Sequence, residues 1–197
     1  MKYPGGIRKQ ANFNKQPSLN VANTYSNRGM SLEEDINATN EYYLELNKAI
    51  IHKKPTPIQI VKVHYPKRSA AVITEGYFQA KSTTDYNGVY NGKYIDFEAK
   101  ETKNKTLFPL ANIHEHQFRH MESILNHGGI SFGIIRFTTH NETYFIKSEI
   151  LLLYWKQMLK DGPKSIPYSI FQKEGWLIPF KYQARVDYLE IIDRLYF

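Results

Sequence analysis

The chain has 197 residues, no cysteine and a formal net charge of +7, from 26 Lys and Arg against 19 Asp and Glu. Its length suits one domain of ordinary size. The lack of cysteine excludes disulfides, thiolate metal sites and a thiol nucleophile, and the positive charge favours a polyanionic partner. The longest uninterrupted apolar run spans 150–155, far short of the ~20 residues of a membrane helix, and no signal-peptide pattern is visible. We therefore expect a soluble, cytoplasmic protein without a membrane partner.

Residues 1–28 differ in composition from the rest of the chain. They contain five basic residues, no acidic residue and many Asn, Gln, Gly and Pro residues, without hydrophobic periodicity. This composition is typical of a flexible basic arm, and on a basic domain it favours contact with phosphates. The alternative is a solvated tail without a binding role. The folded domain is predicted over 29–197.

The first helix is predicted to begin at Ser31. Ser31 and Glu34 fit a capping box, in which each side chain accepts a hydrogen bond from the backbone N–H of the other residue. Apolar residues then recur at helical spacing up to Leu46. The remaining face is acidic and includes Asp35, so we expect this face to point to solvent.

A β-hairpin is predicted over 58–80. Two strand-like segments flank a turn with Pro66 at its second position, which is typical of a type I turn. Lys67 and Arg68 would lie at the tip, where their charges could contact a polyanion. The alternative is an ordinary surface hairpin with two solvated charges.

The segment after residue 82 carries most of the chemical information. An Asn-Gly pair at 91–92 joins two strand-like stretches. This pair is the strongest short hairpin signal, because a type I′ turn needs positive φ at both central residues. A two-residue turn fixes the register, so Asp85 would lie opposite Glu98, and Thr83 opposite Lys100. Side chains alternate along a strand. The polar side chains expected on one face are Asp85, Asp96, Glu98 and Lys100.

Two opposed carboxylates are costly unless a cation lies between them. Opposed strand residues have Cβ atoms about 5 Å apart, and two unit charges at that distance repel by about 3 kcal/mol at an effective dielectric of about 20. A Mg²⁺ or Mn²⁺ ion between the two carboxylates turns their repulsion into attraction to the metal, since these metals prefer hard oxygen ligands. Lys100 would then lie beside the metal, where it could position or deprotonate a water or neutralise phosphate charge. The alternative is an exposed polar face on which Lys100 screens Asp85 and Glu98.

The second half of the chain is predicted to supply most of the sheet and its covering helices. A helix is expected over 112–126, ended by a Gly-Gly pair. Gln117 lies on its largely apolar face, where it could face the catalytic hairpin and hold a water or a phosphate. The alternative is a satisfied, partly buried amide. Further strands are expected over 130–137, 143–147 and 176–180, and further helices over 148–160, 168–174 and from about residue 186.

Five strings along the chain form a family pattern. They are 27–33 (NRGMSLE), 52–57 (HKKPTP), 82–88 (STTDYNG), 95–102 (IDFEAKET) and 113–117 (IHEHQ). In this order they resemble the RecU family, the Holliday junction resolvases of Gram-positive bacteria, and the resemblance extends to residue 188. Asp85 followed by Glu98-Ala99-Lys100 is also similar to the PD-(D/E)xK nuclease signature, in its E-x-K form.

The resemblance implies a fold, an activity and a metal site. The implied fold is α/β, a restriction-endonuclease-like mixed β-sheet core flanked by helices, with a protruding β-hairpin stalk at 58–80 that enters the open centre of a junction. The implied activity is symmetric cleavage of two strands of a four-way junction by a homodimer, in homologous recombination and DNA repair, with Mg²⁺ or Mn²⁺. A twofold dimer suits a twofold-symmetric substrate. The implied metal ligands are Asp85, Glu98 and the backbone carbonyl of Ala99, with Lys100 as the active-site lysine.

Other residues take roles by the same resemblance. Thr83 and Thr84, with Lys100, are expected to contact the phosphate in the transition state. Gln117 and Glu33 are expected to complete the catalytic set, although Glu33 could instead be a first-turn acid that only favours the helix dipole. Contacts with DNA are expected at Lys53, Tyr65, Lys67 and Arg68.

Partners beyond DNA are implied as well. Arg28 matches an arginine associated with control of the RecA recombinase, and RecA and a branch-migration helicase are expected as partners at the nucleoid. One alternative function is a non-catalytic junction-binding or recombinase-regulating protein, and another is a nuclease for plain duplex DNA. The complete set of Asp85, Glu98 and Lys100 argues against the first alternative. The basic hairpin tip argues against the second, because a duplex has no central opening.

Overall fold

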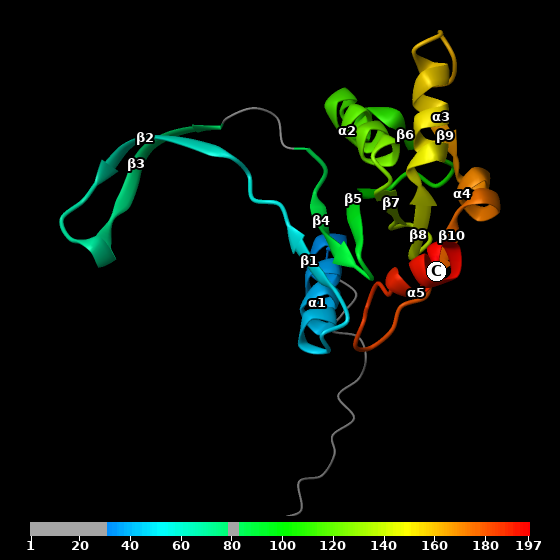
Figure 1. Cartoon of the computed structure of the whole chain (residues 1–197). Helices are drawn as coiled ribbons and strands as arrows, with labels where there is room; N and C mark the ends of the chain where they lie inside the picture. Colours follow the sequence, from blue (N-terminus) through cyan, green and yellow to red (C-terminus); the bar gives the residue numbers. More distant parts are fainter. Residues whose placement is uncertain (1–30, 79–82) are drawn as a thin grey trace, which may run out of the picture.

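The computed structural model describes residues 31–78 and 83–197. The basic arm at 1–28, including Arg28, lies outside these residues, so its predicted roles stay predictions. In the described part, a core of sheet and helices carries a two-stranded hairpin that projects away from it (Figure 1). None of the described helices is long and apolar enough to cross a membrane.

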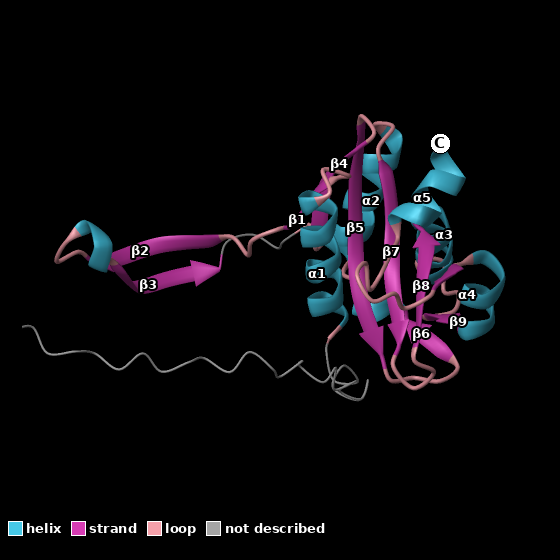
Figure 2. Cartoon of the chain, turned by 90° about the horizontal axis from the view of Figure 1, so that it is seen from below, coloured by secondary structure: helices cyan, strands magenta, loops and turns pink. Residues whose placement is uncertain are grey.

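The core is built on one six-stranded sheet with the order β1-β4-β5-β7-β8-β10. β5 and β7 run parallel, whereas the other neighbours are antiparallel. These two long strands lie at the centre of the sheet (Figure 2). The strands are β1 (Ile50–Lys53), β4 (Tyr86–Tyr90), β5 (Lys93–Thr102), β7 (Ile130–Phe137), β8 (Glu142–Lys147) and β10 (Trp176–Ile178).

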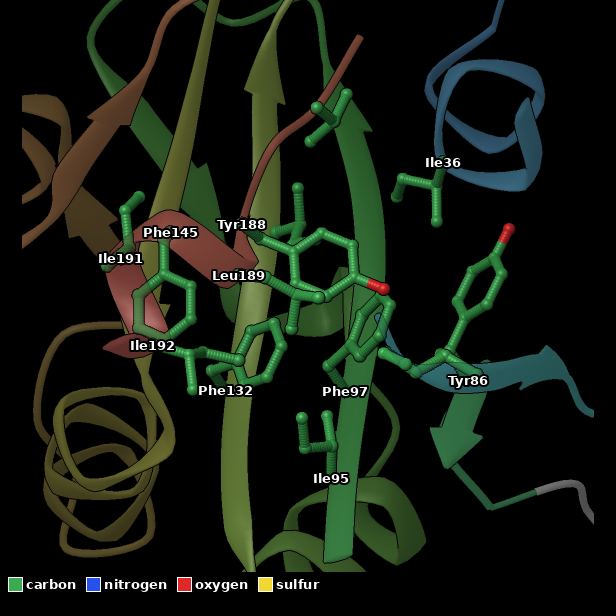
Figure 3. Packing of buried hydrophobic residues seen from close by; sticks show 14 of the residues in the cluster. Ile36, Tyr86, Ile95, Phe97, Phe132, Phe145, Tyr188, Leu189, Ile191 and Ile192 are labelled. Carbon is green, nitrogen blue, oxygen red and sulfur yellow. The ribbon is translucent and has the colours of Figure 1, made fainter. Parts of the chain in front are cut away.

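Helices on both faces of the sheet create two hydrophobic cores. On one face, α1 (Leu32–Glu45) and α5 (Leu189–Tyr196) pack against strand residues that include Phe97 and Phe132 (Figure 3). On the other face, strand residues such as Ile135 pack against a second set of helices. Since alternate side chains of β7 enter different cores, that strand reads as a nearly continuous apolar run. The predicted mixed α/β sheet with flanking helices is confirmed. The second set is α2 (Glu115–Asn126), α3 (Ser148–Met158) and α4 (Tyr168–Glu174), beside β6 (Leu107–Pro109), η2 (Leu110–Asn112) and β9 (Ser165–Pro167).

Helix α1 begins where the capping box predicts. Ser31 Oγ accepts the N–H of Glu34 (3.2 Å), and the Glu34 carboxylate accepts the N–H of Ser31 (2.8 Å). The expectation that Asp35 points to solvent is wrong, because its carboxylate is buried and pairs with Arg136 (2.8 Å) and Arg185 (3.3 Å). A buried carboxylate needs cationic partners of this kind.

The predicted hairpin consists of β2 (Ile58–His64) and β3 (Val72–Phe78), which pair only with each other. Every residue of both strands is exposed, and the hairpin stands clear of the sheet (Figures 1 and 2). The tip differs from the predicted type I turn, since a short 3₁₀ helix, η1 (Arg68–Ala70), follows Lys67. The protruding hairpin of the predicted fold is thus present.

The β4–β5 hairpin has the predicted turn and register. Asn91 and Gly92 have φ of 46° and 73°, as a type I′ turn requires, and the ladder runs from Tyr90 opposite Lys93 to Tyr86 opposite Phe97. β4 begins at Tyr86 rather than at Thr83, so the predicted pairings of Asp85 with Glu98 and of Thr83 with Lys100 are both absent from the ladder.

Four predicted element boundaries in the second half differ from the structure by two or three residues, and one of them is the end of α3, at Met158 rather than at 160. α2 begins at Glu115 rather than at 112, because Ile113 and His114 are extended and separate it from η2. β10 ends at Ile178 rather than at 180, and the last helix begins at Leu189 rather than near 186. These shifts do not move any residue of the candidate site off its element.

Candidate active site

The candidate site lies where β5 extends beyond β4. Residues 93–97 of β5 pair with β4, whereas 98–102 pair on the β7 side and have no ladder partner on the other. The N-terminus of α1 flanks this open edge, because the Leu32 N–H donates to Glu101 Oε1 (2.9 Å). A cavity of ≈ 360 Å³ lies here. It is lined by Ser31, Leu32, Glu33, Asp85, Tyr86, Ala99, Lys100 and Glu101.

Asp85 lies one residue before β4 and turns its carboxylate toward β5. Asp85 Oδ2 accepts the N–H of Ala99 (3.2 Å) and lies 3.3 Å from Lys100 Nζ. The backbone carbonyl of Asp85 accepts the N–H of Lys54 (2.8 Å). The aspartate is therefore fixed at its main chain and at its side chain, although its carboxylate remains partly exposed.

Glu98 is fully buried on the adjacent strand. Lys100 Nζ forms an ion pair with its Oε1 atom, and no other group among the described residues donates to either carboxylate oxygen. Burial raises the pKa of Glu98 to about 8; Lys100 opposes this shift, and the nearby charge of Asp85 adds to it. Without a further cation, this carboxyl therefore releases its proton at a higher pH than an exposed glutamate does.

Lys100 completes a compact group of three ionisable side chains. Burial alone would lower the pKa of its ammonium, but the attraction of Glu98 and Asp85 outweighs burial and raises the pKa above its ordinary value. Lys100 is therefore a cation at neutral pH rather than a free amine. The predicted trio of Asp85, Glu98 and Lys100 lies together on one edge of the sheet.

The residues at this edge fit a hard divalent cation. Buried carboxylate oxygens without hydrogen-bond donors are costly, and Mg²⁺ or Mn²⁺ prefers such ligands. The Ala99 N–H points toward Asp85, and the carbonyl of a strand residue points to the same side as its N–H. Among residues 31–78 and 83–197 no group of three or more acidic or His side chains could hold a metal. Two carboxylates and a carbonyl would thus leave the other positions to water and phosphate.

Gln117 and the two threonines surround the entry to Asp85. Buried Gln117 accepts the His114 N–H (2.9 Å) and donates to the carbonyl of Thr83 (3.3 Å). Thr84 is buried with its hydroxyl donated to Asp96, whereas Thr83 is exposed. Of the two threonines, Thr83 is the one whose surface a phosphate can reach.

Glu33 and Lys53 lie near the site on α1 and β1. Glu33 lines the cavity and forms an ion pair with Lys53, and both side chains are substantially exposed. Tyr65 and Lys67 are also exposed, but they lie at the tip of the β2–β3 hairpin, away from the cavity, where Arg68 begins η1 (Figure 1). Of the predicted DNA contacts, Lys53 thus lies near the site, whereas Tyr65, Lys67 and Arg68 belong to the hairpin.

Two charged residues next to the site, Lys54 and Asp96, have no predicted role from the sequence. Lys54 Nζ lies 2.6 Å from Asp96 Oδ2, and this aspartate is fully buried two residues before Glu98. The strand alternation placed Asp96 on the catalytic face, which was a usable signal. Lys54 carried no signal of its own, because it follows Lys53 in an exposed-looking basic string.

Comparison with known proteins assigns the chain to a family. The model of RecU, described as Recombination protein U, matches residues 27–194. The "Holliday junction resolvase RecU" of Oceanobacillus iheyensis is 62% identical over 100% of both chains. That of Geobacillus kaustophilus is 57% identical over 100% of this chain and 98% of the relative. The chain belongs to the RecU family.

One solved structure is also similar. The Hjc protein of Archaeoglobus fulgidus, titled a Holliday junction resolvase from an archaeal hyperthermophile, aligns with a TM-score of 0.40 and 9% identity, covering 68% of this chain and 88% of that chain. A likeness at this level adds nothing to the family assignment.

Proposed function

We propose that the protein is a metal-dependent endonuclease that resolves four-way DNA junctions by paired, symmetric cleavage. The observation that carries this proposal is Glu98, a fully buried carboxylate whose cationic partner among the described residues, Lys100, it shares with Asp85 at an open sheet edge. Membership of a family whose relatives are named Holliday junction resolvases supports the choice of substrate. The net charge of +7 suits a DNA partner.

The site residues have two proposed roles: some hold a cation, and others neutralise negative charge on the phosphate. Asp85, Glu98 and the Ala99 carbonyl would hold Mg²⁺ or Mn²⁺, which acidifies a water and offsets charge at the scissile phosphate. Because the pKa of Lys100 is raised, its ammonium stays charged and can stabilise negative charge that develops on a phosphate oxygen. Thr83 would orient the phosphate from the other side of Asp85.

The β2–β3 hairpin supports a homodimer that encloses a junction. An isolated two-stranded ribbon is marginally stable in water, yet this one exposes a series of large apolar side chains. A second copy of the chain would cover part of this surface, while Tyr65 and Lys67 at the tip reach the centre of the junction. The exposed apolar side chains are Ile58, Ile60, Val61, Val63, Val72, Ile73, Tyr77 and Phe78.

The proposed setting is the nucleoid in the cytoplasm, where junction DNA forms. RecA and a branch-migration helicase are proposed as partners there. The proposal that Arg28 controls the recombinase rests on the resemblance alone, because this residue lies outside the described part of the chain.

The test is a cleavage assay on a labelled mobile four-way junction and a matched linear duplex, with Mg²⁺ or with EDTA. We expect paired nicks on the junction only, which disappear in EDTA and in Asp85→Asn. Tight junction binding without cleavage in Mg²⁺ or Mn²⁺ would instead favour a non-catalytic junction-binding protein. Equal cleavage of the duplex would favour a nuclease of broader specificity.

A further inference from the structure

Lys54 lies at the base of the β2–β3 hairpin, where both of its strands return to the core. It directly follows β1 on the outgoing side, and Thr83 is the first described residue on the returning side. The Lys54 side chain is only 15% exposed. Its ammonium lies 3.0 Å from Thr83 Oγ1 and 2.7 Å from Thr84 Oγ1, so it joins the two sides of the hairpin base.

The charge of Lys54 is matched by buried Asp96 on β5. Lys54 Nζ lies 2.6 Å from Asp96 Oδ2, and the same carboxylate accepts hydrogen bonds from the Thr84 and Tyr94 hydroxyls and lies 3.2 Å from His120 Nε2. A buried ion pair with this many hydrogen bonds resists displacement, since breaking one contact leaves a charge in an apolar environment.

This network fixes the segment that carries Asp85. Residues 83–85 lie outside the β4–β5 ladder, so strand pairing does not hold them against β5. Lys54 contacts all three residues instead, by its ammonium at Thr83 and Thr84 and by its backbone N–H at the carbonyl of Asp85 (2.8 Å). Gln117 and the Ala99 N–H add one hydrogen bond each, to Thr83 and to Asp85. A displacement of about 1 Å at a reacting group can cost about 100-fold in rate.

We propose that Lys54 is a positioning residue, which locks residues 83–85 onto β5 so that the Asp85 carboxylate meets Glu98, and which ties the hairpin base to the active site. The inference rests on the proposed nuclease function. The Lys54 side chain is largely buried and acts within the protein, whereas the side chain of its neighbour Lys53 is exposed and open to DNA.

The test compares Lys54→Met and Lys54→Arg with Lys93→Met, which removes an exposed lysine at the β4–β5 turn. We expect Lys54→Met to slow single-turnover junction cleavage at saturating enzyme by about 100-fold, with junction affinity in EDTA unchanged. Mn²⁺ binding to the DNA-free protein, followed by electron paramagnetic resonance, should weaken. Lys54→Arg should recover part of the rate, and Lys93→Met should match the wild type.

Two outcomes would overturn the inference. If Lys54→Met weakened junction binding while cleavage at saturation stayed normal, Lys54 would be a DNA contact. If Lys54→Met fails to fold, the double variant Lys54→Met/Asp96→Asn removes both charges and leaves an acceptor for the Thr84 hydroxyl. We expect this double variant to fold and to remain slow, and wild-type cleavage by it would equally overturn the proposal. Failure of the wild type itself to cut a junction would count against the nuclease function instead.

Discussion

Strand β5 carries two fully buried carboxylates, Asp96 and Glu98, which differ in the number of their hydrogen-bond and ion-pair partners. Asp96 has an ammonium, two hydroxyls and an imidazole around it. Glu98 has Lys100, which it shares with Asp85, and no other donor among the described residues. The two side chains lie on the same face of the same strand. Asp96 lies in the part of β5 that pairs with β4, and Glu98 lies just beyond the last pair, Tyr86 with Phe97.

The difference separates a structural acid from a functional one. A buried charge is tolerated when it is paired and fully hydrogen-bonded, as Asp96 is, and is costly when most of its acceptor positions stay empty, as those of Glu98 do. The burial cost of Glu98 makes sense if a ligand outside the chain supplies the missing positive charge. The open half of β5 admits such a ligand, while the half paired with β4 does not.

The largest expected effect is the loss of cleavage in Glu98→Gln. The amide keeps the shape but cannot supply a charged oxygen ligand, so single-turnover junction cleavage should fall by about 10³-fold or more. Without metal at neutral pH, the free energy of unfolding should not fall, because the neutral amide avoids the burial cost that raises the pKa of Glu98. Urea denaturation in EDTA provides the second measurement.

The opposite pattern is expected for Asp96→Asn. Lys54 would keep its buried charge without a matching carboxylate, which should lower the free energy of unfolding by about 3 kcal/mol. Cleavage below the melting temperature should fall by a smaller factor than in Glu98→Gln. If Glu98→Gln proved the more destabilising of the two changes, the division into structural and functional acids would be wrong.

A third difference is expected in the pH dependence of stability. Because the pKa of Glu98 is raised to about 8 in the folded state, the folded protein retains a proton that the unfolded chain releases between about pH 4.5 and 8. This contribution is fully present below that window and is lost as the pH rises through it. In EDTA, stability should thus fall by at most about 1.4 kcal/mol per pH unit from this group.

Denaturation across pH, in parallel with Glu98→Gln, isolates that slope. The variant has no titrating group at position 98, so its stability should show a flatter profile over the same window. Identical profiles for the two proteins would mean that Glu98 is ionised in the metal-free fold, and that Lys100 alone compensates its burial.

Local signals predicted the frame of the site well. Ser31 and Glu34 form their capping box within one helical turn, and the Asn-Gly turn at 91–92 fixes the β4–β5 register. Both depend on residues close in sequence, so the sequence is sufficient to predict them. The position of Asp85 beside Glu98 follows from that register with one further residue.

The rest depends on contacts between distant segments. Lys54 and Asp96 are separated by 42 positions, and the partners of Asp35 come from β7 and from the segment before α5. No periodicity or turn signal links such pairs, since they meet only when the sheet and helices pack. The late start of β4, at Tyr86 rather than at Thr83, has the same origin, because the side-chain bonds of Lys54 and Gln117 hold Thr83 and Thr84 in place of a ladder.

The smallest expected effect is that of Tyr94→Phe, which removes one donor from Asp96. The Tyr94 hydroxyl donates to Asp96 Oδ2 (3.1 Å) and accepts from Asn87 Nδ2 (3.0 Å). Since Asp96 keeps Lys54 and its other partners, the free energy of unfolding should fall by about 1 kcal/mol, and cleavage should not change.

Tyr42→Phe is the matched control, because its hydroxyl makes an exposed hydrogen bond with Gln183 (3.2 Å), and it should cost less than Tyr94→Phe by urea denaturation. A large loss of cleavage in Tyr94→Phe would show that cleavage depends on the position of the Asp96 carboxylate as strongly as on that of Glu98. Asp96 would then belong to the functional acids, although it lies in the part of β5 that pairs with β4.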